Sequence, residues 1–193
     1  KIVAIVQARM GSTRLPGKAL KLITGKAMIE ILLSRLSLSK EINKIVVAIP
    51  ESEDNNLLQL AVESLGFSCY RGSEKDVLNR FYNSAKFVSA DVIVRITGDC
   101  PLVDSILVDE CIREYKNSNV DYFSNTDPAT YPDGLDIEVM SFESIKRANN
   151  ETDSDFDREH VTPYIRNSDS FSKSSMQHAE DLSAQRWSVD EPE

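Results

Sequence analysis

The chain has 193 residues, of which 41% are hydrophobic and 27% are charged, proportions that are ordinary for a folded globular protein. Its net charge of −9 argues against nucleic acid as a partner, because nucleic-acid-binding domains usually present a basic face. Neither a membrane span of roughly 18 apolar residues nor a signal peptide is recognisable. The three cysteines lack metal-ligand spacing, which favours reduced thiols and the cytoplasm. We therefore expect one soluble domain over residues 1–193.

The predicted elements alternate between strands and helices over the first 117 residues. Short apolar runs predict strands at 2–6, 44–49, 67–70 and 92–97. Apolar residues at helical spacing predict helices at 28–36, 57–65, 77–85 and 106–115. This order is typical of an α/β protein with a mainly parallel sheet and helices on both of its faces.

The rhythm changes beyond residue 117. Strand-like segments are expected at 122–124, 135–140 and 171–176, with short helical segments between them. The polar stretch 149–157 is expected to be an exposed loop, and a helix is expected to open at Glu159 and run through Ile165. The last segment, 186–190, is expected to be a strand that ends in an acid.

Residues 7–18 form a loop that is unusually rich in cations, glycine and hydroxyl groups. The loop reads Gln-Ala-Arg-Met-Gly-Ser-Thr-Arg-Leu-Pro-Gly-Lys and directly follows the first predicted strand. Open α/β sheets bind ligands at the carboxyl ends of their strands. Glycines let backbone N–H groups approach phosphate closely, while Arg and Lys neutralise its charge. The loop therefore indicates an anionic ligand, and we favour a nucleoside triphosphate over a loop that is basic by chance.

Two common phosphate-binding motifs do not describe this loop. A Walker A loop has four residues between its glycines and a Ser or Thr after its Lys. Here five residues separate Gly11 from Gly17, and Ala19 follows Lys18. The dinucleotide fingerprint G-x-G-x-x-G is absent as well.

Two carboxylates are expected at the same edge of the sheet as this loop. Asp99 follows the predicted strand 92–97, and Asp190 ends the last predicted strand. Carboxylates that converge near a triphosphate would hold Mg²⁺, which prefers hard oxygen ligands. The alternative for either residue is a turn or a helix cap. For Asp104, which precedes a predicted helix, we favour the cap.

Residues 71–76 join a predicted strand to a helix on the same rim. Gly72 and Ser73 would allow a flat ligand to approach, and Arg71 offers planar donors for a base or a phosphate. Asp76 has two possible roles, ligand contact and N-cap of the following helix, and we favour the cap.

Residues 131–138 contain a Pro-Asp-Gly turn followed by alternating polar and apolar side chains. The alternation places Asp136 and Glu138 on one face of a predicted strand. Solvated polar residues and sugar contacts explain this face equally well. Further along, His160 has no Ser-His-Asp set to join, so we favour a structural role over a catalytic one.

Six sequence blocks together resemble the cytidylyltransferases of bacterial surface-sugar synthesis. The nearest branch is the spore-coat polysaccharide biosynthesis (SpsF) type, which is related to the CMP-KDO and acylneuraminate synthetases. Six blocks in the right order are more specific than any one of them. The blocks are residues 7–18, 71–73, 95–101, 131–136, 158–164 and 186–193.

The resemblance implies a nucleotide-diphosphosugar-transferase fold, a three-layer α/β/α sandwich with a mainly parallel mixed sheet. Residues 120–170 would then form the sugar site, and because related synthetases use part of this region for dimer contact, a homodimer is an open alternative. The family pattern around Asp190 normally continues into Pro-Glu-Asp and a closing helix. The sequence ends at Glu193, so we expect that helix to be missing.

The resemblance also implies roles for individual residues. Catalysis would fall to Arg14, Lys18 and Asp99, and Mg²⁺ would be held by Asp99 and Asp190. The nucleotide would be bound by Ala8, Arg9, Gly11, Ser12, Arg14, Lys18, Arg71, Gly72, Ser73 and Asp76. The sugar would be bound by Tyr131, Asp133, Asp136, Glu138, Glu159 and His160.

The implied reaction is the Mg²⁺-dependent transfer of CMP from CTP to a sugar, acidic or otherwise destined for a surface polysaccharide, with release of pyrophosphate. A glycosyltransferase of the same fold is one alternative. Such enzymes typically use an Asp-x-Asp pair, whereas Asp99-Cys100-Pro101 lacks the second acid. A non-catalytic nucleotide-binding domain of a larger polypeptide is the other alternative.

Overall fold

The computed structural model describes residues 1–191. The last two residues of the block at 186–193, where the family pattern turns toward its closing helix, lie outside this range. The first part of the chain alternates strands and helices as the sequence predicts. Its elements are β1 (Ile2–Gln7), α1 (Met28–Leu36), β4 (Lys44–Pro50), α2 (Asn56–Ser64), β5 (Ser68–Gly72), α3 (Val77–Phe87), β6 (Val92–Thr97) and α4 (Ser105–Ser118).

The second part adds three short strands and three helices. These are β7 (Tyr122–Ser124), β8 (Glu138–Ser141), α5 (Phe142–Glu151), α6 (Asp155–His160), α7 (Pro163–Asn167) and β9 (Lys173–Ser175). Four small elements lie nearer the amino terminus, namely the 3₁₀ turns η1 (Lys18–Leu20) and η2 (Glu53–Asn55) and the strands β2 (Leu22–Ile23) and β3 (Lys26–Ala27), which pair with each other.

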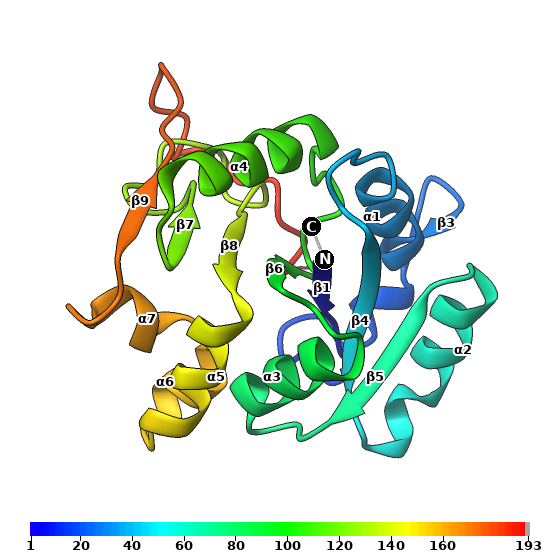
Figure 1. Ribbon diagram of the computed structural model, residues 1–193. Coiled ribbons are helices and arrows are strands. Elements are labelled where there is room, and N and C mark those ends of the chain that lie inside the picture. The colour runs from blue at the N-terminus through cyan, green and yellow to red at the C-terminus, as the bar shows by residue number, and fades with distance from the viewer. Residues whose placement is uncertain (192–193) are drawn as a thin grey trace.

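Seven strands form one mixed sheet in the order β5-β4-β1-β6-β8-β7-β9. The four strands β5, β4, β1 and β6 are parallel, whereas β8 runs antiparallel to both β6 and β7. Figure 1 shows this order, with β1 and β6 in the middle of the sheet and β9 at one side. The region 120–170 therefore continues the main sheet rather than forming a sheet of its own.

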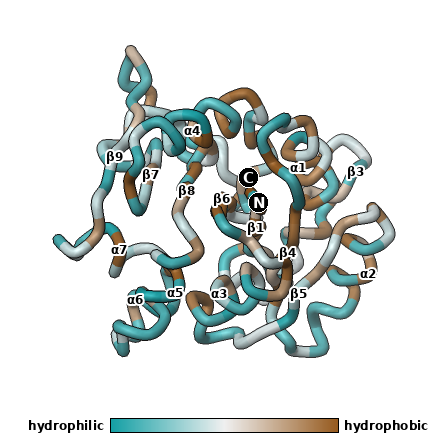
Figure 2. Tube along the Cα trace, viewed as in Figure 1, coloured by the Kyte–Doolittle hydropathy of each residue, from teal (hydrophilic) through white to brown (hydrophobic). Residues whose placement is uncertain are grey.

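Helices cover both faces of the sheet, which makes the predicted α/β architecture with a mainly parallel mixed sheet correct. On β1, Ala4 and Val6 belong to a core cluster with α1, α2 and α4. Their neighbours Val3 and Ile5 belong to a second cluster with α3, α5 and α7. Successive side chains of a strand point to opposite faces, so a continuous apolar strand is what a sheet covered on both sides requires. The hydrophobic residues are concentrated on the central strands in Figure 2.

The cap predictions for two helices are confirmed. The side chain of Asp76 accepts a hydrogen bond from the backbone N–H of Asn79 at the start of α3. The side chain of Asp104 does the same for Ile106 and Leu107 at the start of α4. Both helices therefore begin where their capping residues indicate.

Two predictions for the second part are wrong in detail. The strand expected at 135–140 begins only at Glu138, so Asp136 lies before β8 and does not alternate with Glu138 along it. The stretch 149–157 is not a loop throughout, because α5 extends to Glu151 and α6 begins at Asp155. In α6 the Ser154 side chain accepts a hydrogen bond from Asp157, a local cap that polar composition alone does not reveal.

Two further predictions fail near the carboxyl end of the chain. The single helix expected from Glu159 to Ile165 is two helices, separated where Val161 adopts a positive φ of 75° and Pro163 starts α7. The strand expected at 186–190 does not form, and only one bridge pairs Arg186 with Asp133.

Among residues 1–191 there is no helix with the length and apolar character needed to cross a bilayer.

Candidate functional site

A cavity of about 260 Å³ opens at the carboxyl ends of β1 and β6. The predicted phosphate loop forms one of its walls, and the residues after β6 form another. Seven of the candidate site residues line it, namely Ala8, Arg9, Ser12, Arg14, Lys18, Asp99 and Asp190. The structure thus brings together the two predicted carboxylates and most of the predicted phosphate-binding side chains.

The ammonium of Lys18 connects the two carboxylates at this cavity. Lys18 Nζ donates hydrogen bonds to Asp99 Oδ2 at 3.2 Å and to Asp190 Oδ1 at 2.8 Å. It also donates to the backbone carbonyl of Val189 at 3.1 Å. Asp99 and Asp190 belong to segments far apart in the sequence, yet they share one cation.

Backbone geometry explains how the loop places Lys18 there. The N–H of Gly17 donates to the carbonyl of Met10 at 2.9 Å, which closes the loop on itself, and Gly17 has a φ of 71° that suits glycine. Lys18 then starts the 3₁₀ turn η1. At the opposite wall, a Cβ on Gly98 would lie 2.6 Å from the carbonyl oxygen of Gln7, so only glycine lets the ends of β1 and β6 approach this closely.

Asp190 carries more positive neighbours than Asp99. Besides Lys18, it receives a hydrogen bond from Arg186 at 2.6 Å and lies 3.3 Å from Arg14. Its partial burial alone would raise the pKa of its carboxyl, but the hydrogen bonds from Lys18 and Arg186 outweigh this and lower the pKa to about 2. Asp190 is therefore a stable carboxylate at neutral pH.

The donor set at this cavity fits a magnesium ion that is completed by phosphate. Asp99 and Asp190 offer the hard oxygen atoms that Mg²⁺ prefers. Within residues 1–191 no group of three or more His, Cys, Asp or Glu side chains is arranged to hold a metal ion. Mg²⁺ is usually bound by one or two carboxylates together with substrate phosphates and water, so two carboxylates suffice only when a phosphate ligand is present.

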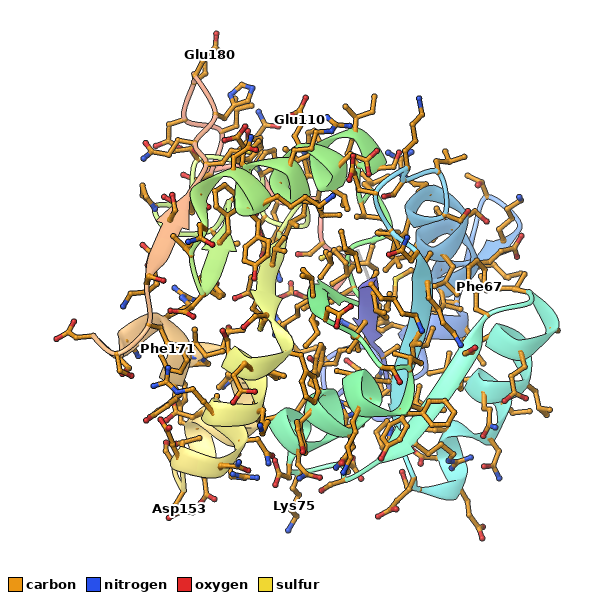
Figure 3. The ribbon with its side chains drawn as sticks, viewed as in Figure 1. Phe67, Lys75, Glu110, Asp153, Phe171 and Glu180 are labelled. Atoms are coloured by element: carbon orange, nitrogen blue, oxygen red, sulfur yellow. The ribbon has the colours of Figure 1, made fainter. Side chains whose placement is uncertain are left out.

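A second cavity, of about 880 Å³, lies beside the first and shares Gln7 and Arg9 with it. Its walls come from the start of α3 and from α6. Figure 3 shows Lys75, one of its lining residues, extending outward from the rim near the start of α3. The other lining residues are Glu74, Asp76, Val77, Arg80, Asp155, Arg158, Glu159 and His160.

Arg158 fixes the two walls of the second cavity to each other. Its guanidinium lies 2.7 Å from Asp76 Oδ2 and also donates to the backbone carbonyls of Asn149 and Thr152. Asp76 thus caps α3 and binds α6 at once. The cavity brings its candidate nucleotide contacts Arg9 and Asp76 close to the candidate sugar contacts Glu159 and His160.

Asp136 is a partly buried carboxyl with an unusual charge environment. Burial raises its pKa to about 6, and the negative charges of Asp133, Glu138 and Asp99 add to this effect while Arg95 opposes it. Asp136 therefore lies within electrostatic reach of Asp99, although it lines neither cavity.

Two candidate residues line neither cavity and make strong contacts elsewhere in the protein. Arg71 donates to the side chains of Asn56 and Gln59 and to two backbone carbonyls of the segment before α2. Glu138 is 3% exposed and forms a buried ion pair with Arg95. Burial alone would raise the pKa of Glu138, but Arg95 and the hydroxyl of Tyr122 hold it below its usual value.

The remaining candidates do not line either cavity. Ser73 accepts the backbone N–H of Asp76 through its hydroxyl, and Gly72 packs against the side chain of Arg80. A Cβ on Gly11 would lie 3.7 Å from a carboxylate oxygen of Glu74. Farther away, Tyr131 makes an edge-on contact with His178, and Asp133 lies 3.4 Å from Arg186.

Sequence reasoning missed several residues at or near these cavities. Gln7, Arg80 and Arg158 line the second cavity, and Arg186 binds Asp190, which lines the first. Gln7 and Arg158 lie inside the family blocks but were given no role of their own. Arg80 carries a signal that could have found it, because a cation on the apolar face of a predicted helix needs a polar partner.

Comparisons with known proteins agree with this geometry. The sequence profile of a family described as cytidylyltransferase matches residues 3–190. The spore coat polysaccharide biosynthesis protein SpsF of Bacillus subtilis is 37% identical over 171 residues, which cover 86% of this chain and 70% of that protein. A 3-deoxy-manno-octulosonate cytidylyltransferase of Pelobacter propionicus is 34% identical over 114 residues, which cover 58% of this chain and 43% of that protein.

A solved structure extends the likeness to three dimensions. A cytidylyltransferase from Leptospira borgpetersenii superposes with a TM-score of 0.93 at 32% identity, covering 98% of this chain and 81% of that chain. The profile match spans nearly the whole of the chain and includes both cavities' lining residues. The chain therefore belongs to the cytidylyltransferase family of nucleotidyltransferases.

Proposed function

We propose that this protein transfers CMP from CTP to an acidic sugar and releases pyrophosphate. The observation that carries the proposal is the position of Lys18, whose ammonium joins Asp99 and Asp190 at the floor of a cavity walled by a cationic loop. This arrangement offers cations for a triphosphate and carboxylates for a metal ion in one place.

The first cavity is suited to the triphosphate. Arg9, Ser12, Arg14 and Lys18 all line it, and they present charged donors and a hydroxyl to the phosphate oxygens. Phosphoryl-type transfer needs little covalent chemistry from the protein, so positioning and charge stabilisation are its main contributions. Arg14 and Lys18 would stabilise the negative charge that develops on the departing pyrophosphate.

Asp99 and Asp190 would hold Mg²⁺ together with the phosphates. The ion would supply charge neutralisation at the α-phosphate and would lower the pKa of a nearby hydroxyl. Lys18 now occupies the space between these carboxylates, so binding of the metal–nucleotide complex requires the ammonium to turn toward the phosphates. The sugar hydroxyl would attack the α-phosphorus in line, and its proton would pass to solvent or to a carboxylate of the site.

The second cavity is suited to the cytidine and the sugar. Its volume of about 880 Å³ lies within the ~300–1,000 Å³ range of small-molecule sites. Glu74 and Asp76 at the start of α3 would face the nucleoside, while Glu159 and His160 on α6 would face the sugar. An acidic sugar is supported by the relative whose name specifies 3-deoxy-manno-octulosonate as its substrate.

The similarity to SpsF supports a place in surface-polysaccharide synthesis. All three cysteines are free, which agrees with a reducing compartment such as the cytoplasm. The resemblance also leaves a homodimer open, and the mass of the protein in solution tests it.

Product analysis tests the proposal. The protein is incubated with CTP, Mg²⁺ and a panel of acidic and neutral sugars, and pyrophosphate and nucleotides are quantified. Pyrophosphate and a CMP-sugar support a cytidylyltransferase. A nucleoside diphosphate released from a nucleotide-sugar donor would instead support a glycosyltransferase. CTP binding without pyrophosphate release from any sugar would support a non-catalytic nucleotide-binding domain.

A further inference from the structure

Arg80 places a buried guanidinium at the wall of the second cavity. The residue is 1% exposed, and its Nε atom has no hydrogen-bond partner among the described residues. Its Nη1 donates to the backbone carbonyl of Ser73, which fixes one side of the guanidinium group. A buried N–H without a partner costs free energy, so an acceptor supplied by a ligand is the simplest explanation of this arrangement.

The charge of Arg80 is only partly compensated within residues 1–191. Glu74 and Asp76 attract its guanidinium electrostatically, but none of the ion pairs of this range includes Arg80, and the nearby Arg9 adds a second positive charge. Burial and then Arg9 lower the pKa of Arg80 to about 10, so the group remains charged at neutral pH. An anion between these guanidinium groups would relieve both the repulsion and the desolvation cost.

Gln7 supplies a complementary group at the same cavity. Its side-chain oxygen Oε1 is buried and has no partner among the described residues, and its position at the end of β1 lets it line both cavities. In the sheet register Gln7 lies beside Thr97, the last residue of β6. An unpartnered acceptor here is suited to a hydroxyl or N–H donor of a ligand.

The local packing holds Arg80 in place. A Cβ on Gly72 would lie 3.1 Å from Cγ and 3.4 Å from Cβ of Arg80, so the missing side chain leaves room for the aliphatic part of the arginine. The phosphates of CTP are not the anion we assign to Arg80, because Arg14 and Lys18 in the first cavity already serve them. The remaining anionic group of the proposed reaction is the carboxylate of the sugar.

We propose that Arg80 and Gln7 select the acidic sugar, with Arg80 binding its carboxylate and Gln7 accepting a hydrogen bond from one of its hydroxyl groups. This inference rests on the proposed function and assigns its sugar specificity to two residues. Both residues act on binding of the sugar, so they affect its KM and leave the affinity for CTP unchanged.

The test compares acceptors that differ only in charge. Pyrophosphate release is measured with 3-deoxy-manno-octulosonate and its methyl ester, and with glucuronate and glucuronamide. For the wild type, kcat/KM favours at least one acid over its neutral counterpart. In Arg80→Gln that preference falls by about 10- to 100-fold, as expected for the loss of a hydrogen bond to a charged group. The change appears in the KM of the acid, while the Kd of CTP stays constant.

Two further variants keep the test decisive. Arg113→Gln removes an exposed arginine of α4 and is expected to behave as the wild type. Gln7→Glu places a carboxylate in the cavity that competes for Arg80, so it also lowers the preference for acids. If thermal unfolding shows that Arg80→Gln does not fold, Gln7→Glu provides the test instead.

Each contrary result has a separate meaning. A wild type that prefers acids, with variants that keep this preference, overturns the inference and leaves the proposed function standing. A wild type that uses only neutral sugars overturns the inference and the acidic substrate while leaving CMP transfer intact. Tight CTP binding without turnover of any sugar contradicts both. Loss of CTP binding in Arg80→Gln would assign the residue to the nucleotide instead.

Discussion

Lys18 Nζ lies 2.8 Å from Asp190 Oδ1, a contact that joins positions 172 residues apart in the chain. Through this contact the phosphate loop after β1 is tied to the segment at 186–190, which forms no strand of its own. The same ammonium also neutralises Asp99. Lys18 therefore holds the two carboxylates together, and in the proposed reaction it would turn toward the phosphates of CTP.

Replacing Lys18 with alanine tests this double role. We expect pyrophosphate release by Lys18→Ala to fall by at least about 100-fold, because a charged donor to the leaving group is lost. The variant should still fold, since Lys18 lies at the surface of a cavity rather than in the core. Lys146→Ala, which removes an exposed lysine of α5, serves as the control. Turnover of Lys18→Ala at the wild-type rate would contradict the assignment.

Ionisation of Asp136 should destabilise the folded protein. Its pKa of about 6 exceeds the ordinary value of 3.8 for an aspartate, so ionisation destabilises the folded protein as the pH rises from 4 to 6. Asp136→Asn should therefore raise the free energy of unfolding at pH 8 by about 1–3 kcal/mol, and by much less at pH 4. Urea unfolding at the two pH values measures this. A variant that is less stable than the wild type at pH 8 would show that the carboxylate is a net stabiliser.

Ionisation of Glu138 should stabilise the folded protein, in contrast to ionisation of Asp136. Arg95 and the Tyr122 hydroxyl, 2.5 Å from Glu138 Oε1, stabilise its ionised form inside the protein. Glu138→Gln leaves the buried guanidinium of Arg95 without its charge partner and should cost about 3–5 kcal/mol of stability. Because the folded pKa of Glu138 lies below its usual value of 4.5, the contribution is present above that pH and is lost as the pH falls below it. Equal unfolding midpoints for Glu138→Gln and the wild type at pH 7 would show that the ion pair of Glu138 with Arg95 does not stabilise the protein.

Arg71 should matter for stability but not for nucleotide binding. Its guanidinium makes four hydrogen bonds to the segment before α2 and to α2 itself, including one of 2.6 Å to Asn56. Arg71→Lys should lower the free energy of unfolding by about 1–2 kcal/mol and leave the Kd of CTP unchanged. Arg14→Lys provides the contrast, because it should weaken CTP binding. A large rise in the Kd of CTP in Arg71→Lys would return Arg71 to the nucleotide site.

The order of elements in the first part could be predicted because apolar periodicity alone decides it. The apolar run of β1 and the helical spacing in α1 or α3 require no distant contact to be recognised. The second part was harder, since β7, β8 and β9 are short and are defined by their pairing in the sheet. The sequence also predicted a strand at 186–190. In the structure this segment instead contacts Asp133 and Lys18, and it pairs with no neighbouring strand.

The candidate site residues also differ in how well the sequence alone could predict them. The cationic loop and Asp99 could be found because they follow predicted strands, which places them at one edge of the sheet. Arg71 and Glu138 carry the same chemistry, and only their contacts in three dimensions show that they face other parts of the protein. The position of Arg80 on the apolar face of a predicted helix is visible in the sequence, but the unpartnered polar atoms of Gln7 and Arg80 are visible only in the structure.

Calorimetry of nucleotide binding tests the central claim most directly. CTP, UTP, ATP and GTP are titrated into the wild type and into Asp99→Asn, each with and without Mg²⁺. We predict that CTP binds selectively, that Mg²⁺ strengthens its binding, and that Asp99→Asn loses the effect of Mg²⁺ while keeping its fold. Equal binding of all four nucleotides, or a Mg²⁺ effect that persists in Asp99→Asn, would contradict a metal–CTP site built on Lys18, Asp99 and Asp190.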